Sequence, residues 1–180
     1  MRTRRIRLLW AGGVAAVAVA AVVATAIAGN GNDNVRATLD GYNEVPAVST
    51  TSSGSFTAQI VDGGSAINYS LKYSALEGNV KQAHIHFGQK FVAAGISAFL
   101  CSNLPSPPPD TPACPPGPAT VTGTIEAADV IGPTGQGIAP GELNELVRAI
   151  RNGVTYANVH SSKFGSGEIR GQLRRGKGEH

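Results

Sequence analysis

The chain has 180 residues, of which 15 are lysine or arginine and 12 are aspartate or glutamate, giving a formal net charge of +3. Four of the arginines and none of the acids lie in residues 1–28, so the rest of the chain carries 11 basic and 12 acidic side chains, a net charge of −1. This balance gives a nucleic-acid partner no electrostatic support, and about 150 residues are enough for one domain around a single core.

Residues 1–28 have the pattern of a secretory signal peptide. The four arginines precede an uncharged, alanine-rich run over residues 8–28. An A-x-A pattern at 26–28 predicts cleavage before Gly29. The alternative is an uncleaved membrane anchor over residues 8–28, since about 20 apolar residues can span a bilayer. Both interpretations place the rest of the chain outside the cytoplasm, secreted or at the cell surface, and limit membrane contact to this segment.

A polar spacer at 29–34 leads into a β-rich domain over residues 35–174, which a basic tail at 175–180 follows. Short segments of the domain alternate between apolar and polar residues and are separated by Gly, Asp and Pro. This pattern predicts an all-β fold, an antiparallel Greek-key-like β-sandwich. Strands are expected around residues 35–39, 56–60, 67–73, 83–87, 96–100, 119–126, 155–160 and 168–173.

One turn signal is strong enough to predict a pairing. The sequence Asp-Gly-Gly at 62–64 separates two alternating segments and is typical of a β-hairpin. We therefore expect the strands around Ala58 and Tyr69 to pair with each other.

Residues 140–153 break the alternating pattern and predict a short amphipathic helix. Apolar residues recur in this segment at the i, i+3, i+4, i+7 spacing of a helix face, and Gly153 can end the helix. We expect this helix to close one end of the sandwich and to serve packing rather than recognition.

Cys101 and Cys114 are the two cysteines of the chain. Export to an oxidising compartment favours a disulfide between them. The bond would close the proline-rich loop 102–113, which cannot join a sheet ladder, and it would contribute roughly 3 kcal/mol. Two free thiols or two metal ligands remain the alternatives.

Three histidines lie in predicted strands. Alternation places His84 and His86 on one face of their strand, with Ile85 on the opposite, core-facing side. His160 ends another strand. Together the three imidazoles could hold a copper or zinc ion. The alternative is that these histidines lie at the surface or hydrogen-bond neighbouring polar groups.

A second polar group would support such a site. Alternation places Glu168 and Arg170 on one strand face, and Asn158 shares a face with His160. We expect Asn158, Glu168 and Arg170 to surround the histidines, with Glu168 or a backbone carbonyl accepting a ring N–H. The alternative for Glu168 and Arg170 is a structural ion pair.

The sequence has no G-x-S-x-G or H-E-x-x-H motif, no catalytic residues are predicted, and we do not expect an enzyme.

The chain contains four ordered motifs, which are ATLDGYNEVP at 37–46, AHIHFG at 83–88, YANVH at 156–160 and GEIRGQL at 167–173. Together they give the chain a resemblance to the CHRD (chordin) domain. They span nearly all of the chain after the leader, although Ala47 and Ser161 depart from the family pattern and the cysteine-bounded loop looks like an insertion. The resemblance implies an extracytoplasmic β-sandwich module, found in bacterial exported proteins and in the animal protein chordin.

The sequence supports two functional hypotheses. The first is an exported binding or structural module for a protein or other extracellular ligand, without catalytic activity. The second is a copper- or zinc-binding protein with dismutase-like redox activity, because the His-x-His strand is also similar to the copper-binding strand of Cu/Zn superoxide dismutase. That similarity is a likeness of folds only.

Overall fold

The alternating segments form nine strands within residues 33–176, the part of the chain that the computed structural model describes. Each expected strand is present, and a two-residue strand follows the last of them. The strands are β1 (Asp33–Asp40), β2 (Ser53–Val61), β3 (Ala66–Ser74), β4 (Val80–Phe87), β5 (Ile96–Ser102), β6 (Ala119–Ile125), β7 (Thr155–Ser161), β8 (Ile169–Gln172) and β9 (Arg174–Arg175).

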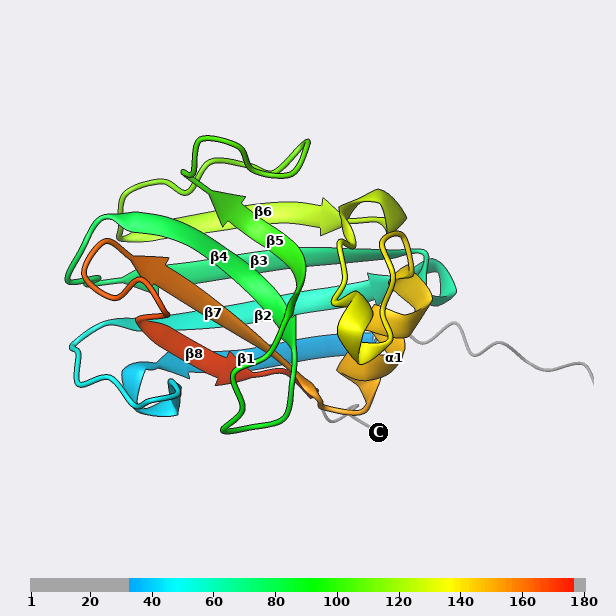
Figure 1. Cartoon of the computed structure of the whole chain (residues 1–180), viewed down its shortest axis with the longest axis horizontal. Helices are drawn as coiled ribbons and strands as arrows, with labels where there is room; N and C mark the ends of the chain where they lie inside the picture. The colour runs from blue at the N-terminus through cyan, green and yellow to red at the C-terminus, as the bar shows by residue number, and fades with distance from the viewer. Residues whose placement is uncertain (1–32, 177–180) are drawn as a thin grey trace, which may run out of the picture.

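The strands pair in the order β5-β4-β7-β8-β1-β2-β3-β6, with β9 beside β1. The pairings are antiparallel, and the end strands β5 and β6 also contact each other, so the sheet is a flattened and nearly closed barrel. Figure 1 shows β5, β4, β7 and β8 crossing over β1, β2, β3 and β6 as two layers. The predicted antiparallel sandwich is confirmed.

The predicted hairpin joins β2 and β3. Ala58 lies opposite Tyr69 in its register, and the turn uses left-handed backbone at Asp62 and Gly63 (φ 49° and 73°). Glycine adopts this conformation without steric cost, which is why an Asp-Gly sequence marks such turns.

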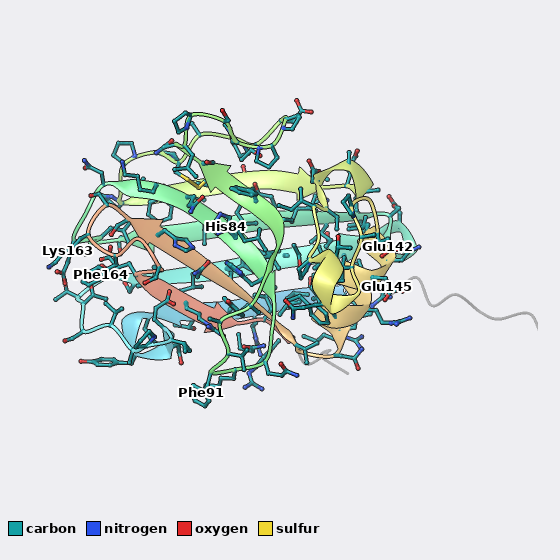
Figure 2. The ribbon with its side chains drawn as sticks, viewed as in Figure 1. His84, Phe91, Glu142, Glu145, Lys163 and Phe164 are labelled. Atoms are coloured by element: carbon teal, nitrogen blue, oxygen red, sulfur yellow. A yellow bond between two sulfur atoms is a disulfide. The ribbon has the colours of Figure 1, made fainter. Side chains whose placement is uncertain are left out.

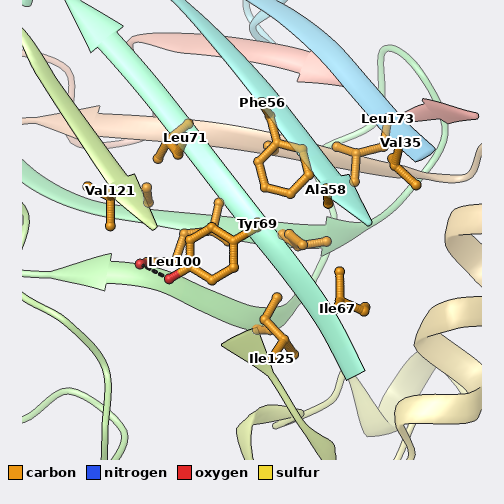
Figure 3. Close-up of a cluster of buried hydrophobic side chains, with 14 of the residues drawn as sticks. Val35, Phe56, Ala58, Ile67, Tyr69, Leu71, Leu100, Val121, Ile125 and Leu173 are labelled. Carbon is orange, nitrogen blue, oxygen red and sulfur yellow. Dashed lines mark hydrogen bonds between the residues drawn. The ribbon is translucent and has the colours of Figure 1, made fainter. Parts of the chain in front are cut away.

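The core lies between the two layers and consists of the inward-facing residues of the strands. Figure 3 shows the side of this cluster around Phe56, Leu71 and Val121. The Tyr69 hydroxyl donates a hydrogen bond to the Leu100 carbonyl oxygen (2.6 Å), which links β3 in one layer to β5 in the other. A polar group at the centre of the core is thereby satisfied, as burial requires.

The helix α1 (Leu143–Arg151) covers one end of the barrel, as expected (Figure 1). Its apolar face, including Leu146 and Ile150, is buried in the core. Gly153 follows the helix with a positive φ of 68°, the left-handed conformation that commonly ends a helix and that glycine adopts readily.

Cys101 and Cys114 form the predicted disulfide. Asn103 reinforces this junction, because its side-chain amide donates to the carbonyls of Val80 (3.1 Å) and Cys114 (2.8 Å) and accepts from the Cys114 N–H (3.0 Å). The proline-rich excursion is therefore tied to the barrel at both ends.

The leader predicted at 1–28 and its cleavage position lie outside the described residues, as do residues 29–32 of the spacer and 177–180 of the tail. Within residues 33–176, no helix has both the length and the apolar character needed to cross a membrane.

Candidate metal centre

The outer face of the β5-β4-β7-β8 layer carries the polar residues that the sequence singled out. In the β4–β7 pairing, His84 lies opposite Asn158 and Ile85 lies opposite Ala157. Because side chains alternate along a strand, Ile85 and Ala157 enter the core while the other two point to the outer face. All seven residues of β7 are buried, so this outer face is covered rather than exposed.

His84, His86 and His160 come together on this face. One nitrogen from each ring lies within 4.8 Å of the others, and all three side chains are buried. The ring centroid of His84 lies 5.3 Å from that of His86 and 4.9 Å from that of His160. Figure 2 shows His84 projecting from β4 in the middle of the layer.

In this histidine cluster (His84, His86 and His160), two backbone carbonyls fix the ring protons of His86 and His160. Nδ1 of His86 lies 2.8 Å from the Ala94 carbonyl oxygen, and Nδ1 of His160 lies 2.9 Å from that of Gly165. A carbonyl oxygen can only accept, so each Nδ1 carries the proton and donates it. In the neutral rings each Nε2 then holds a free lone pair that points into the cluster.

Asn158 lies between these lone pairs. Its side-chain Oδ1 is 3.0 Å from Nε2 of His86 and 3.1 Å from Nε2 of His160. Two lone-pair acceptors require two donors, and the amide NH2 group has two N–H bonds. Because the two ends of the amide have nearly the same shape, a half-turn of the side chain exchanges Oδ1 for NH2 and satisfies both lone pairs when no metal is bound.

His84 differs from the other two histidines. Its side chain is 0 % exposed, and neither of its ring nitrogens has a hydrogen-bond partner within the described part of the chain. Its closest aromatic neighbour is Phe99 of β5, with ring centroids 4.4 Å apart in an edge-to-face arrangement.

Burial keeps the histidine cluster neutral. It lowers the pKa of His84 to about 2, with the nearby His160 and His86 rings adding to the effect, and it lowers the pKa of His86 to about 4. The pKa of His160 is also lowered by burial. Three neutral imidazoles held close together are the form in which histidine binds a metal ion.

Arg170 holds the loop that covers His86. Its guanidinium donates to the carbonyls of Gln89 (3.2 Å) and Val92 (2.8 Å) and lies 3.3 Å from the centroid of the Tyr156 ring. Tyr156 in turn stacks on His86, with centroids 4.7 Å apart. Arg170 thus fixes loop 88–95 and supports His86 through Tyr156, and it is not an ion-pair partner of Glu168 in this structure.

Glu168 is fully buried but serves a different contact. Its Oε1 accepts hydrogen bonds from the hydroxyls of Thr50 (3.1 Å) and Ser52 and from the Glu77 N–H (2.8 Å). Glu168 therefore secures the neighbouring loops, while the carbonyls of Ala94 and Gly165 accept the histidine ring protons.

A comparison with protein-family models matches residues 35–173 to the CHRD domain. The chain belongs to the CHRD domain family. No curated protein and no solved structure matched the chain. CHRD membership supports a binding or structural module that lies outside the cell, and the disulfide fits an oxidising compartment.

Glu44, in the first CHRD motif, is a buried acidic residue near Arg170 that the sequence analysis did not single out. Its carboxylate is buried against Gly167, where a β-carbon would lie 2.5 Å from Glu44 Oε1. Burial raises the pKa of Glu44 to about 7, and the positive charge of Arg170 opposes that rise. A single acidic residue in a loop has no periodicity that could predict its burial. The only sequence signal for Glu44 was therefore its place in a family motif.

These pKa shifts predict that acid destabilises the metal-free CHRD domain. Below pH 6.5 the unfolded chain protonates its histidines, whereas folded His86 stays neutral down to about pH 4, so stability falls as the pH falls. Glu44 acts oppositely between pH 4.5 and 7, because the folded state keeps its proton there. His84 and His86 against one carboxyl leave a net loss of at least about 1 kcal/mol between pH 6.5 and 5.5, and the lowered pKa of His160 adds to this loss.

Urea denaturation at both pH values in the presence of a chelator measures this loss. Glu44→Gln is the matched control, since it keeps the shape of the side chain and removes the opposing titration. The loss in this variant should be larger by about 1 kcal/mol. Stability that is constant or higher at pH 5.5 in the wild type would contradict the neutral cluster.

Proposed function

We propose that this CHRD domain is an exported module that binds one zinc or copper ion through His84, His86 and His160. The observation that carries the proposal is the environment of His84. A buried polar ring without protein partners costs about 1–3 kcal/mol, and a cluster that served packing alone would be better made of apolar residues.

The other two histidines support the same proposal. Their Nδ1–H groups donate to backbone carbonyls, which is the outer contact that orients metal-binding histidines and leaves Nε2 free. Zinc–nitrogen bonds of about 2.0–2.1 Å and tetrahedral angles place ligand atoms about 3.3 Å apart. The present separations, within 4.8 Å, reach that spacing when the rings turn inward.

The proposed location rests on the N-terminal segment and the disulfide. We infer that residues 1–28 direct export and that the mature module begins near Gly29. No catalytic step is proposed. Dismutase-like activity has no support from the site, because the candidate ligand group within residues 33–176 contains three histidines and no carboxylate.

Calorimetric titration of zinc and copper(II) into chelator-treated protein tests the proposal. We expect the wild type to bind one ion per chain and the His84→Ala/His86→Ala double variant to lose this binding. Gln82→Ala is the matched control, since Gln82 lies on the same strand and is not part of the cluster. Equal and weak binding by wild type and double variant at neutral pH would rule out the metal site.

A further inference from the structure

We propose that Asn158 supplies the fourth ligand of this metal centre through its amide oxygen, which makes the centre closed and four-coordinate. The inference rests on the proposed metal site and specifies its coordination. A closed site has a structural or storage role, whereas a catalytic site keeps a position open for water or substrate.

The position of the Asn158 amide carries the inference. Oδ1 of Asn158 lies 3.0 Å and 3.1 Å from the Nε2 atoms of His86 and His160. These separations are close to the spacing of about 3.3 Å between ligands in a tetrahedral zinc site. The amide oxygen therefore already lies where a fourth ligand belongs, relative to two of the three histidines.

The amide can serve both states of the site because its two ends have nearly the same shape. Without metal, a half-turn about the last side-chain bond lets NH2 donate to the two Nε2 lone pairs. When those lone pairs bind a metal ion, NH2 loses its acceptors, and Oδ1 takes the place that it has in the structure. The carbonyl oxygen then faces the cation, and the amide needs no additional space.

The backbone also favours this ligand set. Asn158 lies directly opposite His84 in the β4–β7 register, so the four donors come from two adjacent strands. All four side chains are buried, with Asn158 3 % exposed and no histidine of the set above 7 %. The burial leaves little room for a solvent molecule to compete with the amide.

Cobalt(II) substitution of the full mature protein tests the inference. We expect the wild type to give the intense visible bands of tetrahedral cobalt, and we expect azide to leave them unchanged because no position is open. In Asn158→Leu, which keeps the branching and removes both polar atoms, zinc affinity should fall at least about tenfold. Azide should then shift the cobalt bands of this variant, since solvent takes the fourth position.

Asn158→Asp provides the matched partner variant, because it keeps an oxygen in the same place and adds a charge. It should bind zinc more tightly than the wild type. In the absence of metal it should be less stable, because its oxygens face the two Nε2 lone pairs. Near-ultraviolet circular dichroism checks that each variant is folded.

Three results would overturn the inference. An azide shift in the wild type equal to that in Asn158→Leu, or tighter zinc binding by Asn158→Leu, would show that Asn158 only fills the metal-free site, and the three-histidine centre would stand. If none of the three folded proteins binds cobalt or zinc, the metal centre itself is contradicted, together with its fourth ligand.

Discussion

Ile85→Asp is expected to lower the free energy of unfolding by about 4 kcal/mol or more, since it places an unpaired carboxylate in an apolar interior. Ile85 is 0 % exposed and lies among core residues of β4 and β7. Within residues 33–176 the buried cation is Arg170, whose guanidinium contacts loop 88–95 and the Tyr156 ring on the outer face, so it does not pair with a carboxylate at position 85.

Equilibrium urea denaturation measures the effect, and two control variants define its cause. Ile85→Val removes one methylene group and should cost about 1 kcal/mol. Lys81→Asp introduces the same charge at an exposed position of the same strand and should change stability by about 0.5 kcal/mol or less. If Ile85→Asp were no worse than Lys81→Asp, the assignment of the two faces of β4 would be inverted.

His84→Leu is expected to act in the opposite direction, although its side chain is just as buried. In metal-free protein this change should raise the free energy of unfolding by about 1–2 kcal/mol, because it removes two ring nitrogens that lack partners within residues 33–176. Leucine has a similar volume and can pack against Phe99. A residue whose removal stabilises the fold is retained for binding rather than for stability.

Added zinc should reverse this order. At about a thousand times its Kd, zinc stabilises the wild type by about 4 kcal/mol, whereas His84→Leu should gain nothing. Denaturation curves should therefore show His84→Leu as the more stable protein with chelator and the wild type as the more stable protein with zinc. A metal-free His84→Leu protein that is less stable than the wild type would show that His84 has a structural role.

Local patterns predicted the strands and the convergence of the histidines. A period of two puts Ile85 in the core and His84 opposite, and a sandwich brings the strand of His160 beside that of His86. The four family motifs added that these segments belong to one domain and occur in the order of the CHRD family. The hairpin and the helix likewise followed from local signals, whereas the disulfide followed from the predicted export and from the two cysteines of the chain.

The covering of the outer face could not be predicted from sequence. It depends on loops 88–95 and 162–167, whose carbonyls accept the ring protons of His86 and His160. Loop conformation has no periodicity, and backbone carbonyls are present at every residue. The direct contact of Asn158 with two rings depends on a side-chain distance that strand alternation does not define.

Elemental analysis of the mature domain tests the metal centre most directly. The protein should be exported by its own leader, purified without a histidine tag or metal-affinity step, and analysed by mass spectrometry beside His84→Leu prepared in the same way. The account predicts about one zinc or copper ion per wild-type chain and none in the variant. A wild-type metal content equal to that of His84→Leu, both as purified and after incubation with zinc or copper and gel filtration, would contradict it.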